Sequence, residues 1–376
     1  MYLLIAFLLS GAAVNSLPTF REHVIANDLK GGYQVAAVDL TGDGRSDLIA
    51  LASGMSELAW YENPGWNRHV IATGLSSPIN VAASDAQRGR TPELVLATGF
   101  SMYPAKSTGE VWSLRHQGDP RKPWSITQID RLPTSHRLRW ADLDGSGKKV
   151  VINAPLAGAD ATAPDYRSKT PLVFYQPGKW KRELISDETE GVMHGFTTID
   201  WDGDGREEIL TASFQGIHLF QRDAGGRWSR TELAKGCPEA WPKSGSSDIA
   251  VGKLAGRRFL CSIEPWHGNQ LAVYLQQGNK WNRHVIDDTL VEGHALAAAD
   301  LDGDGMDEIL GGFRGSGHSI SIYKAASSDG TRWERHVLDT EIPASSCVVV
   351  DLNGDGRPDI ACIGGSVLKW YENLGK

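Results

Sequence analysis

Three histidines recur at one position of the sequence, six residues before the first Asp of a recurring acidic turn. They are His136, His194 and His294, and Tyr33 holds the same position in an earlier copy. Imidazole groups bind transition metals such as zinc, iron, nickel or copper. Because imidazole also titrates near neutral pH, it can act as a general base or acid. The repeated position predicts a catalytic or metal-binding cluster with Tyr33 as a proton donor, although duplication of a structural residue is an alternative explanation.

Guanidinium and aromatic groups accompany these histidines. Arg139 lies three residues after His136, and we expect it to stabilise a carboxylate or a developing oxyanion. Long loops predicted on the same face of the protein contain groups suited to binding a sugar ring or an acid, and such loops often carry binding residues. The residues expected to bind substrate are Tyr103, Arg137, Trp241, Trp266, His267, Arg314 and His318.

Acidic turns form a second group of candidate ligands. Two copies place four carboxylates at positions 1, 3, 5 and 9 of the turn, with Gly205 or Gly305 at position 6. Oxygen ligands on alternate residues of a tight turn suit a hard cation such as Ca²⁺. The residues expected to bind structural calcium are Asp39, Asp43 and Asp47; Asp200, Asp202, Asp204 and Glu208; Asp300, Asp302, Asp304 and Glu308; and Asp351, Asn353, Asp355 and Asp359.

Two details define the limits of this prediction. Position 12 is Thr211 or Gly311 in the two full copies, so the turns are not EF-hands, which need a bidentate Glu there. In the copy that starts at Asp142, Ser146 and Val150 replace two ligands, and we expect that site to be weak. A metal-free turn, held by hydrogen bonds from its own backbone, is the alternative for every copy.

The acidic turns mark a repeat of about 50 residues that occurs seven times. Each unit contains a short apolar strand, the turn, a second strand, an aromatic strand such as Trp60-Tyr61, and a fourth strand that begins at a Trp. Complete turns start at Asp39, Asp142, Asp200, Asp300 and Asp351, and eroded copies lie near Asp85 and Gly252. Four strands in each of seven units predict an all-β, seven-bladed β-propeller with four antiparallel strands per blade.

The ends of the chain indicate how the ring closes. The last unit stops at Trp370-Tyr371-Glu372-Asn373 without a fourth strand, and a spare copy of that strand, FREHVI, begins at Phe20. We expect the N-terminal strand to complete the last blade, which would remove an exposed sheet edge. Residues 17–376 are therefore expected to form a single propeller domain, with the acidic turns on one face and the histidines and long loops on the other.

The first sixteen residues predict a secretory signal peptide. Leu3–Leu9 is an apolar core followed by small residues, and it is shorter than the roughly 20 residues of a membrane span. We therefore expect a secreted or periplasmic protein that is not embedded in a membrane. Cys347 and Cys362 flank one predicted hairpin, so they could form a disulfide bond or remain as buried thiols.

The charge balance bears on the partners of the protein. The chain has 38 Lys and Arg against 46 Asp and Glu, a net charge of −8, and no basic block. A nucleic-acid partner is therefore not expected. We expect a monomer whose partner is a carbohydrate or polysaccharide.

The repeat resembles a known family of propellers. The acidic turns, the repeat length and the WYEN strands are similar to FG-GAP/VCBS-repeat propellers, a group that includes the integrin α-chain head. The combination of ELAWYENPGW, RHVI and a histidine six residues before DxDGDG more narrowly resembles the propeller domain of fungal aldos-2-ulose dehydratases and related secreted bacterial proteins. This resemblance implies elimination chemistry on a carbohydrate. Those dehydratases also contain cupin domains, which have no counterpart here, so their isomerase activity is not implied.

Hypotheses from different functional classes follow. The first is a carbon–oxygen lyase, a dehydratase or a polysaccharide-lyase-like enzyme, in which His136, His194 or His294 is the base, Tyr33 or a second histidine the acid, and Arg139 or a bound metal the charge stabiliser. The second is a non-catalytic FG-GAP/VCBS module that binds glycan or protein through its long loops. A scaffold without a small-molecule site is the third. A glycosidase would need two carboxylates flanking the scissile bond, and no pair is singled out by its spacing.

Overall fold

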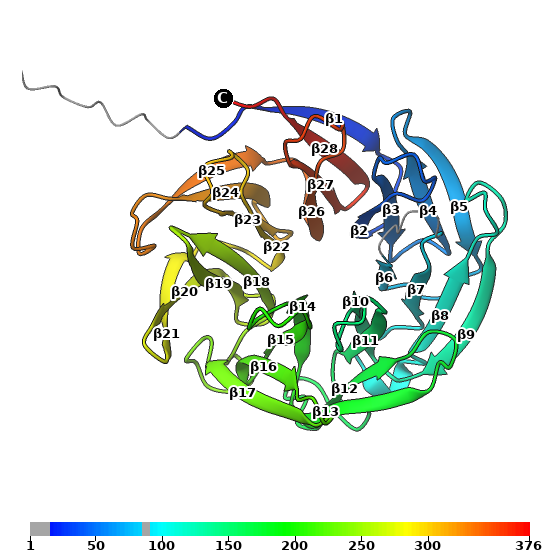
Figure 1. The fold of residues 1–376 in the computed structure, drawn as a ribbon, viewed down its shortest axis with the longest axis horizontal. Coiled ribbons are helices and arrows are strands. Elements are labelled where there is room, and N and C mark those ends of the chain that lie inside the picture. The colour runs from blue at the N-terminus through cyan, green and yellow to red at the C-terminus, as the bar shows by residue number, and fades with distance from the viewer. Residues whose placement is uncertain (1–15, 85–90) are drawn as a thin grey trace, which may run out of the picture.

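Seven four-stranded sheets surround a central axis in the computed structural model, which describes residues 16–84 and 91–376 (Figure 1). Each sheet is one antiparallel blade, and its first strand lies nearest the axis. The seven-bladed all-β propeller predicted from the repeat is therefore confirmed. The predicted signal peptide, except for its last residue, and the eroded turn at Asp85 lie outside the described residues. In the described parts of the chain, no helix is long and apolar enough to cross a membrane.

The blades follow the order of the chain. Blades 1 to 3 contain β2 Gly32–Val38, β3 Asp47–Ala52, β4 Glu57–Glu62 and β5 Asn67–Thr73; β6 Asn80–Ala83, β7 Leu94–Thr98, β8 Glu110–Arg115 and β9 Ser125–Arg131; and β10 Ser135–Ala141, β11 Val150–Pro155, β12 Lys169–Tyr175 and β13 Arg182–Glu190. A short 3₁₀ helix, η1 Pro104–Lys106, interrupts the loop between β7 and β8.

Blades 4 to 7 complete the ring. They contain β14 Met193–Ile199, β15 Glu208–Ser213, β16 Gly216–Arg222 and β17 Trp228–Ala234; β18 Asp248–Leu254, β19 Arg257–Glu264, β20 Gln270–Gln277 and β21 Lys280–Asp287; β22 Gly293–Ala299, β23 Glu308–Phe313, β24 Ser319–Ala325 and β25 Trp333–Asp339; and β26 Ser346–Val350, β27 Asp359–Gly364, β28 Val367–Asn373 and β1 Phe20–Ala26.

The two ends of the chain share blade 7. Strand β1 pairs antiparallel with β28, with Phe20 opposite Asn373 and Val24 opposite Lys369, and Figure 1 shows the two strands side by side. The predicted closure by the N-terminal strand is confirmed. Strand β1 thereby covers the outer edge of β28, which would otherwise be unpaired.

Apolar side chains fill the spaces between neighbouring blades. Trp60 of blade 1 is completely buried and belongs to one cluster with Leu94, Leu96 and Trp124 of blade 2. Asparagine side chains add hydrogen bonds between blades: Asn63 Nδ2 donates to Leu352 O at 2.6 Å, and Asn373 Nδ2 donates to Leu301 O at 2.8 Å. The recurring aromatic and WYEN residues are therefore explained by packing and by links between blades.

Tyrosines of the aromatic strands also join blades 3, 6 and 7 to the blade that precedes each of them. The phenols of Tyr175 and Tyr323 donate to Asp130 at 2.6 Å and to Asp287 at 2.7 Å. Tyr371 repeats this arrangement with Asp339 of blade 6, at 2.7 Å. A hydrogen bond to a carboxylate is about twice as strong as one between neutral groups. These bonds supply a specific reason for tyrosine at this repeat position.

The cysteines adopt both of the states that the sequence left open. Cys347 on β26 and Cys362 on β27 lie opposite each other and form a disulfide bond. Cys237 and Cys261 are buried free thiols.

Lys369 offers a test of the closure. Its ammonium group is buried and lies 2.9 Å from Glu22 of β1, 2.9 Å from Asp339 of blade 6 and 3.0 Å from Glu341. We expect Lys369→Met to lower the free energy of unfolding by about 3 kcal/mol, because the buried Asp339 carboxylate would lose its counter-charge. Urea unfolding measures the change. The control Lys181→Met, at an exposed position, should change it by less than about 0.5 kcal/mol, and an equal effect of both substitutions would contradict the prediction.

Candidate functional site

A β-bulge marks the repeat position that carries Tyr33 and the three histidines. In blades 1, 3, 4 and 6 the pairing between the first and second strands skips one residue, and the skipped residues are Tyr33, His136, His194 and His294. The corresponding pairings of blades 2, 5 and 7 have no register shift. A bulge bends the strand and redirects a side chain. The four bulges therefore explain how these side chains turn from the strand toward one another.

The structure brings these four side chains together, although they come from four different blades. The hydroxyl of Tyr33 lies 3.1 Å from Nε2 of His136. Ring centroids are 4.8 Å apart for His136 and His194, and 5.2 Å apart for His194 and His294. The three histidines are no more than 3% exposed. We refer to His136, His194, His294 and His267, described next, as the histidine cluster.

His267 joins the cluster from the loop between β19 and β20. Its Nε2 lies 3.1 Å from Nε2 of His194. Ser247 holds both residues, because its carbonyl accepts from Nδ1 of His194 at 3.1 Å and its hydroxyl accepts from the backbone N–H of His267 at 3.2 Å. Sequence reasoning missed Ser247, which lies directly before β18.

The loop that carries His267 is anchored at a buried carboxylate. Glu264, at the end of β19, is completely buried. It accepts hydrogen bonds from Ser246 Oγ at 3.0 Å, from Arg283 Nε at 2.7 Å and from the phenol of Tyr274. Burial raises the pKa of Glu264, and these partners oppose that shift. Glu264 therefore has a structural environment, with its oxygens directed at protein groups.

Three histidines have the geometry of a metal site. His194, His267 and His294 each offer one ring nitrogen, and these nitrogens lie within 4.8 Å of one another. Nδ1 of His294 donates to Ser345 O at 2.5 Å, as Nδ1 of His194 does to Ser247 O. A hydrogen bond from Nδ1 to a carbonyl leaves Nε2 with a free lone pair and is typical of histidines that bind metals. Nε2 of His294 is buried and has no hydrogen-bond partner among the described residues.

Electrostatics keep the cluster neutral. Burial holds the pKa values of His136, His194 and His294 well below the usual range, and the charges of Arg137 and of neighbouring imidazoles act in the same direction. Burial, then Arg314 and Arg137, lower the pKa of His267 to about 3. Neutral imidazole is the form that binds a metal ion or accepts a proton.

The arginines lie beside the cluster. Nη1 of Arg137 lies 3.4 Å from the hydroxyl of Tyr33. Arg139 donates to Leu138 O at 3.1 Å. Arg314 lies 3.4 Å from Nδ1 of His267 and 3.3 Å from Glu292. A metal ion on Nε2 of His267 would therefore require Arg314 to turn toward Glu292, because Nδ1 would then carry the proton.

Some of the residues predicted to bind substrate lie next to the histidine cluster, and others have no contact with it. Trp266 packs against His267, with ring centroids 5.0 Å apart, and both Trp266 and Trp241 pack on Phe214. These tryptophans form a wall next to the cluster. Tyr103 is 55% exposed and contacts Lys106. His318 contacts Glu341 O at 3.2 Å, and no contact joins it or Tyr103 to the cluster in the described chain.

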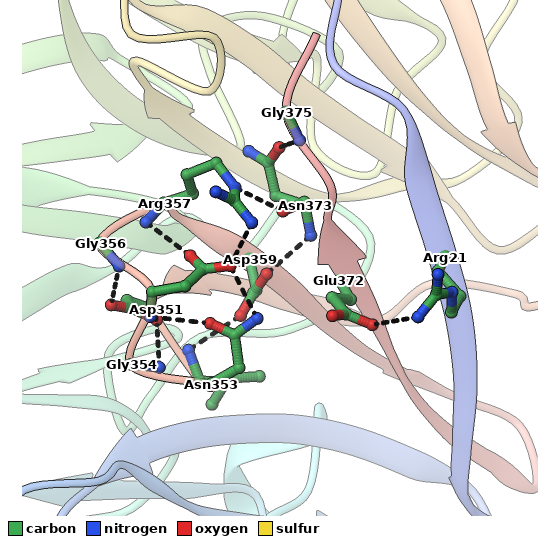
Figure 2. Close-up of polar contacts among 12 residues, drawn as sticks. Arg21, Asp351, Asn353, Gly354, Gly356, Arg357, Asp359, Glu372, Asn373 and Gly375 are labelled. Carbon is green, nitrogen blue, oxygen red and sulfur yellow. Dashed lines mark hydrogen bonds and ion pairs between the residues drawn. The ribbon is translucent and has the colours of Figure 1, made fainter.

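The acidic turns share a hydrogen-bonding plan, which Figure 2 shows for blade 7. Asp351 accepts from the N–H groups of Gly354 at 2.7 Å and Gly356 at 2.8 Å. Asp359, at position 9, accepts from the N–H groups of Leu352 and Asn373 at 2.9 and 2.7 Å. Asp39, Asp200 and Asp300 accept the same type of bonds.

Position 9 holds a buried carboxylate with a raised pKa in the turns of blades 1, 4, 6 and 7. Burial, opposed by backbone hydrogen bonds, raises the pKa of Asp47 to about 6. For Glu308, burial outweighs the effect of Lys324 and raises the pKa to about 7. Burial also raises the pKa values of Glu208 and Asp359. In blade 4, oxygens of Asp200, Asp202 and Glu208 lie within 4.8 Å of one another. The turns therefore concentrate negative charge at the face opposite the loops.

Comparisons with known proteins agree with the repeat analysis. Residues 108–277 match the family model of the aldos-2-ulose dehydratase β-propeller domain, and residues 300–362 match that of an FG-GAP-like repeat. An aldos-2-ulose dehydratase of Phanerodontia chrysosporium is 23% identical over 421 aligned residues, which cover 95% of this chain and 45% of the relative. The chain thus spans less than half the length of that relative.

Solved structures show the same fold. Two crystal structures of BBS1N in complex with ARL6DN, one soaked with mercury and one with lead, superpose with TM-scores of 0.60 and 0.59. Each is 12% identical, and each match covers 95% of this chain and 96% of the other. The resemblance predicted from the acidic turns and the WYEN strands is confirmed: the chain is a seven-bladed propeller that is similar to an FG-GAP-like repeat over residues 300–362 and to the propeller domain of aldos-2-ulose dehydratase over residues 108–277.

Proposed function

We propose that this propeller is a dehydratase-like lyase that acts on a carbohydrate at the histidine cluster. The observation that carries the proposal is the convergence of His194, His267 and His294, two of which have Nδ1 bound to a carbonyl and Nε2 directed into the cluster. Similarity to a dehydratase at 23% identity supports the reaction class. The residues fit a divalent transition metal such as zinc.

The residues of the chain divide the work of an elimination. A dehydration breaks a C–H and a C–O bond of the substrate, and it releases water. The hydroxyl of Tyr33, 3.1 Å from neutral His136 and 3.4 Å from Arg137, can pass a proton to the imidazole while it receives the proton of the C–H bond. The nearby guanidinium stabilises the negative charge on the phenol oxygen. A metal held by the other three histidines would polarise a substrate oxygen as a Lewis acid.

Calcium, secretion and the substrate class remain parts of this proposal. The turn of blade 4 offers three convergent carboxylates with a buried member at position 9, a set suited to Ca²⁺. The Cys347–Cys362 disulfide is consistent with an oxidising compartment and supports export. We propose a carbohydrate as partner, bound beside the wall of Trp241 and Trp266, with the protein acting as a monomer.

Replacing the proposed ligands tests the metal site. We expect His194→Ala, His267→Ala and His294→Ala each to weaken zinc binding by about a hundredfold or more, because each removes one ligand. A competition titration with a chromophoric chelator measures the affinity, and the near-ultraviolet absorbance of an unsaturated product measures turnover of anhydrosugar or uronate substrates. His336→Ala, on the outer strand β25, is the control and should change neither quantity. Glycan binding without turnover by the wild-type protein would instead favour a binding module.

Replacing Ser247 tests whether this residue orients the histidines of the cluster. Ser247→Ala removes the hydroxyl, which accepts from His267 N–H and lies 3.2 Å from Nδ1 of His194, but keeps the carbonyl that accepts from His194. We expect zinc affinity to fall about tenfold, as for other residues that orient metal ligands, while the unfolding midpoint changes little. Ser229→Ala, at an exposed position of β17, is the matched control. Unchanged zinc affinity in Ser247→Ala would remove Ser247 from this role.

A further inference from the structure

We infer that the cavity beneath the histidine cluster binds the carboxylate of an acidic sugar, an inference that rests on the proposed function and narrows its substrate class. The cavity measures about 70 Å³, and its wall includes Tyr33, Arg137, Arg139, Asp248, His294 and Ser345. Tyr33 and His294, which occupy the repeat position described above, thus line the same cavity as the two arginines. A volume of this size admits a carboxylate group.

The charge of the cavity is positive. No carboxylate of the described chain lies within ion-pair distance of Arg137 or Arg139. Asp248 is the acidic residue on the wall. Burial raises its pKa, although Arg137 opposes this shift. The raised pKa weakens the ability of Asp248 to neutralise the two guanidinium groups. Burial and the charge of Arg137 disfavour a second cation at Arg139. A buried pair of like charges calls for an anion between or beside them.

Hydrogen-bond donors in the cavity exceed acceptors. A guanidinium carries five N–H bonds, and the protein acceptors are Tyr33 Oη for Arg137 and Leu138 O for Arg139. The polar neighbours are already engaged, because Gln34 makes two hydrogen bonds to the backbone of Val81 and Asn80 accepts from Leu138 N–H. The arginines therefore determine which ligand the cavity accepts. Their planar fork matches a carboxylate.

Carboxylate binding here would assist the proposed elimination. The proton lost from a sugar acid lies on the carbon next to the carboxylate, and its removal places further negative charge on the carboxylate oxygens. Guanidinium groups at those oxygens stabilise this charge. The proton passes to the Tyr33–His136 pair, and the leaving oxygen departs with the electron pair of its C–O bond and takes up a proton. The products are an unsaturated sugar acid and water or an alcohol.

A neutral isostere of the ligand tests the inference in the wild-type protein. Calorimetric titration compares D-glucuronate with D-glucuronamide, and we expect glucuronate to bind at least tenfold more tightly. Arg139→Gln should remove this preference. Arg227→Gln, which deletes an exposed guanidinium on the turn after β16, should keep it. Equal binding of the two sugars, or a preference that survives in a folded Arg139→Gln variant, would overturn the inference.

Two further measurements separate the possible outcomes. Acetate binding as tight as that of glucuronate would overturn the sugar-acid assignment, because the cavity would then recognise a small anion only. Turnover is measured apart from binding. Tight, arginine-dependent glucuronate binding without any unsaturated product would sink the proposed elimination and still support the carboxylate site.

A second inference concerns the acidic turn of blade 6, where we propose that a lysine ammonium takes the place of calcium. Lys324 of β24 is 7% exposed. Its Nζ forms ion pairs with Asp302, with Asp304 at 3.0 Å and with Glu308 at 3.1 Å. Lys376 adds a second ammonium 3.2 Å from Asp302. Three of the four residues predicted to bind Ca²⁺ in this turn are thus neutralised from within the chain.

The turns of blades 1, 4 and 7 have no lysine at this position. The residue at the repeat position of Lys324, directly after the aromatic pair, is Glu62 in blade 1, Gln221 in blade 4 and Glu372 in blade 7. Gln221 donates to Asp202 at 3.3 Å and carries no charge. A buried ammonium and a Ca²⁺ ion would repel each other at the same carboxylates. In blade 4, Arg206 pairs with Asp204, but Asp200, Asp202 and Glu208 still converge beside a neutral side chain. In blade 6, Asp300, Asp302 and Asp304 also converge, but the buried ammonium of Lys324 already lies against two of them and against Glu308, so the turn of blade 4 fits calcium better.

Calcium stoichiometry tests this assignment. We expect Lys324→Gln, which installs the residue of blade 4, to bind one more Ca²⁺ per chain than the wild type in a titration with a fluorescent calcium indicator. Glu308→Gln in the otherwise wild-type protein should leave the count unchanged. Both variants are prepared in millimolar calcium so that folding does not limit the comparison. A lower count in Glu308→Gln, or no gain in Lys324→Gln, would overturn the proposal.

Discussion

Closure of the ring by β1 is the constraint on which the rest of the structure depends. Blade 7 has strands from both ends of the chain, so the circle is complete only when Phe20–Ala26 pairs with β28. Once closed, each blade is packed between two neighbours and cannot tilt alone. Hydrogen bonds from Asn63 and Tyr371 to adjacent blades reinforce this arrangement. The ring thereby fixes how far apart the inner strands lie.

That rigidity makes a polar cluster near the axis possible. Burying imidazole and guanidinium groups is unfavourable unless they have hydrogen-bond partners. The blades supply these partners in pairs: His194 of bulged blade 4 donates to Ser247, which precedes the regular inner strand of blade 5, and His294 of blade 6 donates to Ser345 at the start of blade 7. A bulged blade thus presents a histidine, and the next, regular blade presents the carbonyl that orients it.

The repeat allowed most of the architecture to be predicted from the sequence. The seven units, the N-terminal closing strand and the meeting of Tyr33 with His136, His194 and His294 all depend on periodic positions, and a period is visible in a single chain. The Glu264 network and Lys324 escaped prediction because each works through side-chain contacts that break the repeat, and Ser247 escaped it because its backbone carbonyl, which any residue type carries, orients His194. His318 contacts Glu341 O and Tyr103 contacts Lys106, and no contact joins either predicted residue to the cluster in the described chain.

Side-chain contacts that break the repeat also explain why acidic turns of similar sequence have different groups beside their carboxylates. The turns of blades 1, 4, 6 and 7 direct backbone N–H groups at their first Asp and bury a carboxylate at position 9. Burial raises the pKa of that carboxylate in all four, so each of these turns is stabilised by a nearby positive charge. The turn motif creates the need for a positive charge near these carboxylates, but a residue on the neighbouring strand determines whether the chain itself supplies that charge. A lysine on that strand meets this need in blade 6, whereas blade 4 has a neutral glutamine at the same position.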